Sequence, residues 1–483
     1  MQRLLLTSAL LGSTLAFAVP VHAQCAPDGG ADGSVVTCSG TDLDGFDFKD
    51  ADGITLTVEN GATVQDAPGG NEAIRVDDDA DITVEQGGTV SSFGDDAIQL
   101  DKDGMITNSG AIFSTTKDAL NLGEGATVIN TSTGDIDGDD EAIAAEDDLR
   151  VANSGFITAG DKAIDTEGFD DLTVINTGTI NATDKAIRAG ADDDDNGGNG
   201  LFVNNSGTII SQTDEGIESG NNAEIRNSGS IKAFDDAIQV GTGAMIVNSG
   251  LIENTAGAGE DPQDAIDIDE GIITNEAGGR IISTFDAAID FDEGPGGGLV
   301  ENFEGAEISG LIGIETDPGD TGGQEVDNRG KIIGTGGVAM NLGRGRDVVV
   351  QYDTGEIDGR VNLGEGEDTF ALFGTDHGDV AGLTFIDGGA DEDTFRAVDF
   401  LLENLVSVSF GIGTDVQLGF EKNGDATQIQ LSSFEIFKFG NASTEVTRTL
   451  TELKGVLAPV PLPAAGWLLF GALGGLAALR RKR

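Results

Sequence analysis

Hydrophobic residues recur along most of the chain in three short pieces, which are separated by turns that contain Gly or Asp. Within each piece apolar and polar residues alternate, and this is the period of a β-strand with one buried face. In this repetitive part of the chain, no stretch keeps the 3.6-residue apolar stripe of an amphipathic helix. The pattern therefore predicts an all-β chain.

The three pieces repeat in a fixed order. The first is Val or Ile followed two residues later by Asn, and the second is an Ile just past the next Gly. The third is Ala-Ile or a close variant, which recurs from Ala73-Ile74 to Ala339-Met340 with a mean spacing of about 24 residues. Three short strands per repeat predict a parallel β-helix, a solenoid in which each coil stacks on the previous one.

The Asn of the first piece forms a column of its own. If the Val or Ile points inward, the Asn two residues later points inward as well. A lone buried amide is costly, but stacked amides can bond to each other in a ladder. The alternative is that each Asn caps its own turn locally. The column comprises Asn108, Asn130, Asn153, Asn176, Asn205, Asn227, Asn248, Asn275, Asn302 and Asn328.

Acidic residues precede the third piece in most repeats, so a β-helix would stack them at one corner. Lys117, Lys162 and Lys185 interrupt this column. Bound Ca²⁺ could offset the remaining repulsion, but we favour a solvated acidic face, since no single loop shows a complete ligand set. The acidic residues are Asp95, Asp96, Asp118, Asp140, Glu141, Asp161, Asp184, Asp214, Glu215, Asp235, Asp236, Asp264 and Asp286.

Three Gly- and Asp-containing segments follow near the end of the repeats, at 342–347, 363–370 and 388–395. They resemble degenerate forms of the RTX calcium nonapeptide, and this resemblance implies Asp347, Asp368 and Asp393 as metal ligands and Ca²⁺ as the cofactor. Leu replaces the first Gly twice, and the three Asp residues lie 21 and 25 residues apart. That spacing fits one turn of a β-helix per coil better than a calcium roll.

The composition excludes several functions. With 26 basic and 86 acidic residues the net charge is −60, which excludes nucleic acid as a partner and disfavours anionic membrane surfaces. His22 and His377 are the only histidines and Cys25 and Cys38 the only cysteines, so a multi-His or Cys-rich zinc site cannot form. We predict no catalytic residues. Divalent cations, basic surfaces and neutral glycans or matrix ligands remain as partners.

The N-terminus has the features of a secretory signal peptide over residues 1–23. Arg3 precedes an apolar stretch at 4–19, and small residues at 21 and 23 form a cleavage site. The alternative is a buried N-terminal helix. Cys25 and Cys38 would then lie in an oxidising compartment, which favours a disulfide over two free thiols.

The C-terminus combines a Pro-containing motif, an apolar segment and a basic end. The motif is Val460, Pro461, Leu462, Pro463 and Ala464, and the basic end is Arg480, Arg481, Lys482 and Arg483. A helix over 464–479 would be about 24 Å long, slightly short for a bilayer. The basic residues would act as a membrane stop in the cytoplasm, with the body outside.

This tail closely resembles the VPLPA-CTERM sorting signal, a relative of the PEP-CTERM signal of Gram-negative bacteria. The resemblance implies recognition by an exosortase, a membrane transpeptidase, and delivery by the secretion machinery to the cell surface or the extracellular matrix. The alternative is a plain C-terminal anchor, and in either case the membrane is contacted only through this helix. The repeat body resembles a β-helical autotransporter passenger.

We therefore expect a signal peptide at 1–23, an N-terminal cap at 24–50, β-helix repeats at 51–395, a β-rich cap at 396–450, a tether at 451–459 and the sorting tail at 460–483. Loss of both ends would change the net charge from −60 to −65, because five basic residues leave with them. The favoured function is a secreted structural or adhesive protein. The alternatives are a polysaccharide lyase, hydrolase or epimerase, and a calcium-binding scaffold.

Overall fold

The computed structural model describes residues 25–27, 30–66, 69–166, 170–190, 199–257, 263–292, 296–374 and 385–456. These residues form a parallel β-solenoid of about 14 turns, as the repeat pattern predicts. The chain divides into two compact units, one made of residues 1–146 and 150–159 and the other of residues 147–149 and 160–483.

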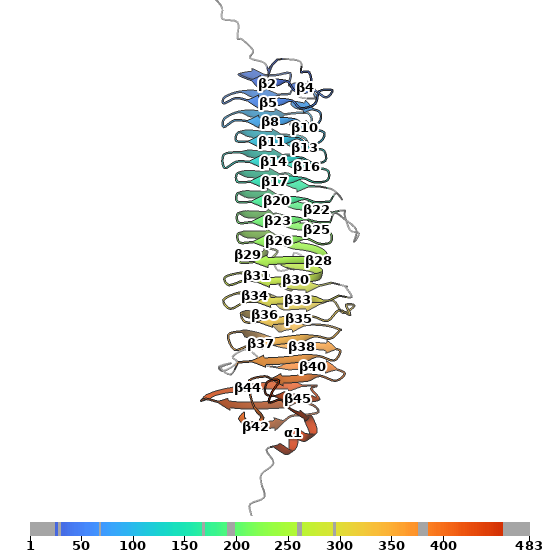
Figure 1. The fold of residues 1–483 in the computed structure, drawn as a ribbon, viewed down its shortest axis with the longest axis vertical. Coiled ribbons are helices and arrows are strands. Elements are labelled where there is room, and N and C mark those ends of the chain that lie inside the picture. The colour runs from blue at the N-terminus through green and yellow to red at the C-terminus, as the bar shows by residue number, and fades with distance from the viewer. Residues whose placement is uncertain are drawn as a thin grey trace, which may run out of the picture. The chain divides into compact units, whose positions relative to one another are not determined.

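In the first unit each coil contributes three short strands, and like strands of successive coils pair in parallel (Figure 1). The first strands are β2 (Val35–Cys38), β5 (Thr55–Val58), β8 (Asp81–Val84), β11 (Met105–Asn108), β14 (Thr127–Asn130) and β17 (Arg150–Asn153). The second strands are β3 (Thr41–Asp42), β6 (Thr63–Gln65), β9 (Thr89–Ser92), β12 (Ala111–Ser114), β15 (Asp135–Gly138) and β18 (Phe156–Ala159). The third strands are β4 (Phe46–Phe48), β7 (Ile74–Val76), β10 (Ile98–Leu100), β13 (Leu120–Leu122) and β16 (Ile143–Ala145).

The start of the first unit is closed by a strand that runs against the others. β1 (Cys25–Ala26) pairs antiparallel with β2, with Cys25 opposite Cys38. A disulfide joins these two cysteines, and both are buried.

The second unit continues the same three-strand pattern. Separate strands are β19 (Ile164–Asp165), β20 (Thr173–Asn176), β21 (Thr179–Ala182), β22 (Ile187–Ala189), β23 (Phe202–Asn205), β24 (Thr208–Ser211), β25 (Ile217–Ser219), β26 (Glu224–Asn227), β27 (Ser230–Ala233), β29 (Leu251–Asn254), β31 (Arg280–Ser283), β32 (Ile289–Phe291), β33 (Gly298–Asn302), β35 (Glu325–Asn328), β37 (Val348–Tyr352), β39 (Thr369–Phe373), β40 (Ile386–Ala390) and β41 (Thr394–Ala397).

Some strands of the second unit pass through a corner without a break. In β28 (Ile238–Asn248) and β30 (Ile266–Asn275) the third strand of one coil runs on into the first strand of the next. In β34 (Glu307–Thr316), β36 (Lys331–Asn341) and β38 (Glu356–Glu365) the second strand runs on into the third. The pairings contain register shifts at these corners, and such irregularities bend a strand without ending it.

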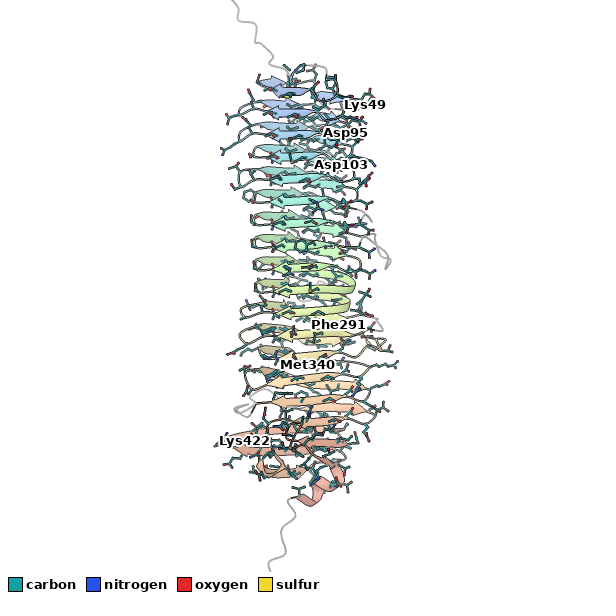
Figure 2. The ribbon with its side chains drawn as sticks, viewed as in Figure 1. Lys49, Asp95, Asp103, Phe291, Met340 and Lys422 are labelled. Atoms are coloured by element: carbon teal, nitrogen blue, oxygen red, sulfur yellow. A yellow bond between two sulfur atoms is a disulfide. The ribbon has the colours of Figure 1, made fainter. Side chains whose placement is uncertain are left out.

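The core consists of the inward residues of every coil. Ile106 pairs with Val128, for example, and both side chains are fully buried. Away from these corners the strands keep one register, because a slip of one residue would turn the whole apolar set outward. In Figure 2 Phe291 and Met340 lie within their coils, whereas Lys49 projects outward.

A different arrangement follows residue 396. The 3-10 helix η1 (Leu402–Asn404) leads into three antiparallel strands, β42 (Leu405–Phe410), β43 (Val416–Lys422) and β44 (Asp425–Ser432), and β45 (Ile436–Phe439) pairs with β46 (Val446–Thr449). β44 and β45 also pair in parallel with β40 and β41. Phe400, Phe420, Phe434, Phe437 and Phe439 are buried here, whereas Phe410 is 40% exposed. Helix α1 (Leu450–Val456) follows, so the first part of the expected tether is helical.

Candidate functional site

A column of buried amides runs through the second unit at the end of each first strand. The side-chain nitrogen of Asn176 donates to the side-chain oxygen of Asn205 at 2.8 Å. The same bond joins Asn205 to Asn227, Asn227 to Asn248, Asn248 to Asn275, Asn275 to Asn302 and Asn302 to Asn328 at 2.8–3.0 Å. Asn328 donates in turn to the amide oxygen of Gln351 at 2.8 Å. These side chains are 0–2% exposed, so the ladder lies inside the coils.

The first unit contains the same ladder. Asn108 donates to Asn130 at 3.0 Å, and Asn130 donates to Asn153 at 2.9 Å. All three side chains are buried. The repeated contact therefore occurs in each unit considered by itself.

Six of these residues also cap their own turn, so the two interpretations of the column hold together there: Asn108, Asn153, Asn176, Asn205, Asn227 and Asn248. The Oδ1 atom of Asn248 accepts the backbone N–H of Gly250 at 3.1 Å, and its Nδ2 atom also donates to the carbonyl of Arg280 at 3.2 Å. Both polar atoms of the amide are thus satisfied although the side chain is buried. Gly250 is required here, because a Cβ would lie 2.2 Å from the Gly229 carbonyl oxygen.

A second column, of serine hydroxyls, lies at the end of some second strands and was not predicted. Ser114 accepts the backbone N–H of Lys117 at 3.0 Å and donates to the carbonyl of Asp95 in the previous coil at 2.8 Å. Ser211 makes equivalent bonds to Asp214 and Asp184. A Ser three residues before an acidic or basic residue is the sequence feature that could have indicated this role.

Residues with positive φ angles occur at the turn before many of the first strands. Asp79, Asp103, Asp148, Asp171 and Asn222 adopt positive φ angles of 53–63° at this turn, and Gly occupies the equivalent place in several other coils. Within the first unit the Asp103 N–H donates to the Glu124 carbonyl at 2.8 Å. Asp and Asn tolerate this conformation better than other non-glycine residues. Part of the Asp excess is therefore turn chemistry.

In one part of the second unit a lysine offsets part of the negative charge of the acidic residues that precede the third strands. The Lys185 ammonium contacts Glu215 and lies 3.0 Å from Asp214 and 3.2 Å from Glu218. Its side chain is 13% exposed. Burial by itself lowers the pKa of Lys185, but the surrounding carboxylates outweigh it and raise the pKa above the usual value.

Further along the same unit, acidic residues near the third strands lie close to other acidic residues, and these raise their pKa values. Burial, followed by neighbouring acidic groups, raises the pKa of Asp236 to about 8 and that of Asp264 to about 10. The pKa values of Asp267 and Asp290 rise to about 7 for the same reasons. One oxygen each of Asp264 and Asp290 is buried without a hydrogen-bond partner. These carboxyls therefore retain protons at pH values where exposed Asp is ionised.

The three Asp residues that the RTX-like motifs indicate form an inter-coil ladder. Their Oδ1 atoms accept backbone N–H groups of the preceding coil: Gln324 donates to Asp347 at 2.7 Å, Asp347 to Asp368 at 2.8 Å and Asp368 to Asp393 at 2.9 Å. All three side chains are buried. Their Oδ2 atoms have no hydrogen-bond partner. Burial raises the pKa of Asp347 to about 8, that of Asp368 to about 6 and that of Asp393 to about 7.

This arrangement does not fit a shared calcium site. Ca²⁺ takes six to eight oxygen ligands, whereas each of these carboxyls already uses one oxygen to bind backbone. Asp347, Asp368 and Asp393 are also absent from the groups of three acidic side chains in the described residues whose oxygens lie within 4.8 Å of one another. The motif residues thus bind neighbouring coils, and we derive no calcium chemistry from them.

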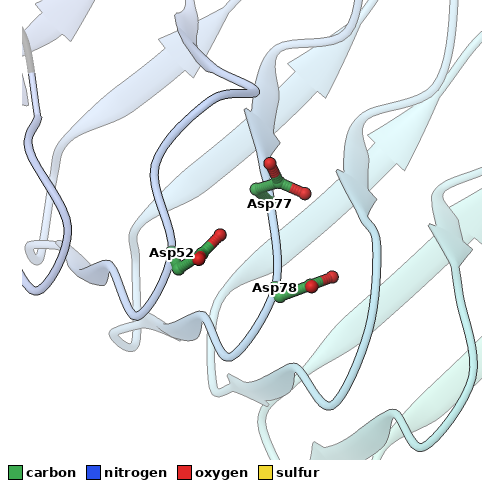
Figure 3. Close-up of side chains that lie close together, drawn as sticks. All are labelled: Asp52, Asp77 and Asp78. Carbon is green, nitrogen blue, oxygen red and sulfur yellow. The ribbon is translucent and has the colours of Figure 1, made fainter.

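Such groups of acidic oxygens do occur elsewhere. One comprises Asp52, Asp77 and Asp78 on neighbouring turns of the first unit (Figure 3). The others are Asp118 with Asp140 and Glu141, and Asp214 with Glu215 and Asp235. Asp52 is exposed and most other members are partly exposed, whereas Asp118 and Glu215 are each only 9% exposed.

Several predicted features lie outside the described residues. These are the signal peptide at 1–23, His377, the sorting motif Val460–Ala464, the helix over 464–479 and the membrane stop Arg480–Arg483. Among the residues that are described, no helix is both long enough and apolar enough to span a membrane.

Comparison of the chain with protein-family models, with curated proteins and with solved structures found no significant match.

Proposed function

We propose that this chain is a non-catalytic structural or adhesive protein of the cell surface or extracellular matrix. The observation that carries the proposal is the repetition of one polar contact, coil after coil, from Asn176 to Asn328. A binding or catalytic pocket needs residues that depart from their neighbours, whereas a repeated contact serves the continuity of the solenoid itself.

The physical properties of the ladder suit that role. Each coil is bonded to the next through backbone strands, stacked Ile and Val side chains and a saturated amide column. Opening one coil breaks all three kinds of contact together, so the solenoid resists local unfolding. The net charge of −60 keeps the surface solvated and leaves divalent cations, basic surfaces or glycans as ligands for the exposed loops.

The proposed location outside the cytoplasm is supported by the two ends of the sequence. The stretch at 1–23 directs export, and the motif Val460–Ala464 would be recognised by an exosortase-type transpeptidase. The disulfide Cys25–Cys38 is compatible with an oxidising compartment outside the cytoplasm. The body would then be released or attached beyond the inner membrane.

Localisation in the producing cells tests the destination. The tagged full chain is compared with a Pro461→Ala/Pro463→Ala variant and with Pro459→Ala, which changes a neighbouring proline outside the motif. We expect the wild type and Pro459→Ala at the surface or in the medium without their tails. The double variant should stay in the membrane fraction with its tail attached. Equal processing of all three chains would contradict the sorting role.

A second experiment tests the role itself. Deletion of the chain should weaken cell attachment or matrix cohesion, and wild-type chain supplied on a plasmid should restore it. Unchanged attachment and cohesion would count against the proposal. Turnover of an acidic or neutral polysaccharide by the purified chain would replace it with the enzymatic alternative.

A further inference from the structure

The C-terminal cap leaves one strand edge open. Among the described residues β42 pairs with β43 and with no other strand. Consecutive residues of β42 are exposed, so both of its faces reach solvent. Val406 is 54% exposed, and Ile412, just beyond the strand, is 92% exposed. An open edge with exposed apolar side chains is a template for another strand.

This edge also differs from other edges in charge. Residues 404–414 contain no acidic or basic residue, although the whole chain carries a net charge of −60. By contrast β3 and β46, which also pair on one side only within the described residues, contain Asp42 and Arg448. Charged side chains are the usual protection of an edge strand, and β42 lacks them. Two acidic chains can therefore approach at β42 without burying like charges.

We propose that β42 pairs antiparallel with β42 of a second copy of this chain. The pairing is isologous, since the same strand contributes from both copies about a two-fold axis. It extends the antiparallel sheet β42–β43–β44 across the interface. A partner strand here must be uncharged, rich in β-branched or aromatic residues and open along one edge, and β42 itself meets these requirements.

Charge at the ends of the strand supports the antiparallel direction. Glu403 lies just before β42, and the Lys454 ammonium of α1 lies 5.4 Å from the centroid of the Phe410 ring at the other end. Antiparallel pairing places the Glu403 end of one copy beside the Phe410 end of the other. Opposite charges then meet at both ends of the interface.

Sedimentation equilibrium of the purified full chain tests the pairing from about 1 to 100 μM, the range of weak to moderate association. We expect a monomer–dimer equilibrium that tightens when salt screens the acidic surfaces. Val408→Lys should weaken the dimer at least about tenfold, since a lysine on an open edge strand opposes strand pairing and the two-fold axis brings the two introduced charges close together. Ile272→Lys is the matched control, because Ile272 is 42% exposed on β30, whose two edges are already paired.

Exchanging the charges at the two ends of β42 tests whether the two strands pair in the antiparallel direction. Lys454→Glu should weaken the dimer, and Glu403→Lys/Lys454→Glu should restore it. Circular dichroism spectra equal to that of the wild type would show that the variants fold. A wild-type chain that stays monomeric at about 100 μM, or a Val408→Lys dimer as tight as the wild type, would overturn the proposal. Failure of the double exchange to restore a dimer weakened by Lys454→Glu would overturn the antiparallel arrangement.

Discussion

The Nδ2 atom of Asn227 donates to the Oδ1 atom of Asn248 at 2.9 Å, across two coils whose paired residues lie 21 positions apart. Asn227 in turn receives the equivalent bond from Asn205 at 2.8 Å, and its Oδ1 atom accepts the Gly229 N–H at 3.2 Å. One amide therefore joins three successive coils. Substitution of such an amide removes bonds in both directions along the solenoid.

Asn227→Leu should lower the free energy of unfolding by about 3–5 kcal/mol, because it leaves two or more buried polar groups without partners. Chemical denaturation measures the change. Asn204→Leu is the matched control, since Asn204 is an exposed Asn on β23, and its effect should stay within about 0.5 kcal/mol. Equal effects of the two substitutions would refute a stabilising role for the ladder.

Stability should fall as the pH rises from about 4 to about 8. Burial raises the pKa of Asp236 to about 8 and that of Asp264 to about 10, so the folded state keeps protons that the unfolded chain loses near pH 4. Each such proton lowers the unfolding free energy by about 1.4 kcal/mol per pH unit until the folded pKa is reached. Denaturation at pH 5 and pH 8 measures the difference.

The same experiment on Asp264→Asn assigns the pH effect to this cluster. The substitution should stabilise the protein at pH 8 and flatten the pH dependence, since a neutral amide replaces a carboxyl that resists ionisation. Glu276→Gln, at an exposed position of the same unit, should leave the slope unchanged. A protein that is more stable at pH 8 than at pH 5 would contradict the expected direction.

Lys185→Met should destabilise the protein by about 3–5 kcal/mol at pH 7, because it removes the cation beside Glu215 and Glu218, whose side chains are 12% and 14% exposed. Arg188 lies 3.8 Å from Glu218 and offsets only part of this loss. Thermal or chemical unfolding checks this loss. Lys331→Met provides the comparison: Lys331 pairs with Glu356 at 2.7 Å, but both side chains are about half exposed. An exposed pair contributes about 0–1 kcal/mol, so a similar loss in both variants would exclude the special role of Lys185.

Calcium removal should leave the melting temperature unchanged. The ladder of Asp347, Asp368 and Asp393 is held by backbone N–H groups, and no ion is needed to connect its coils. Melting curves in chelator and in about 1 mM Ca²⁺, where extracellular modules typically bind, provide the measurement. A higher melting temperature in calcium would favour the alternative of a calcium-binding scaffold, with the acidic corners as its sites.

Much of the fold could be predicted from local pattern. The period of Ile106, Ile112 and Leu120 placed three strands in a coil and turned these side chains inward, where the structure also has them. The amide column followed from the same alternation. The serine column and the positive-φ Asp turns were missed, because Ser and Asp are common in every kind of turn and their roles depend on atoms of another coil.

For the RTX-like motifs, the sequence predicted the spacing of the Asp residues but not their role. Their Asp residues recur once per coil, which the spacing indicated, but a resemblance to calcium motifs could not reveal that Asp368 would accept the Asp347 N–H. The unpaired edge of β42 could not be predicted from the sequence either, because pairing on one side only is a property of the assembled sheet.

The sequence by itself determined the strand period, the inward apolar set and the candidate amide column, because alternation along a strand is local and the coils repeat it. Only the tertiary structure decided which polar atoms meet, which carboxyls are buried without a cation and which strand stays unpaired. These properties depend on contacts between residues more than twenty positions apart, and inserts of variable length change that separation from coil to coil.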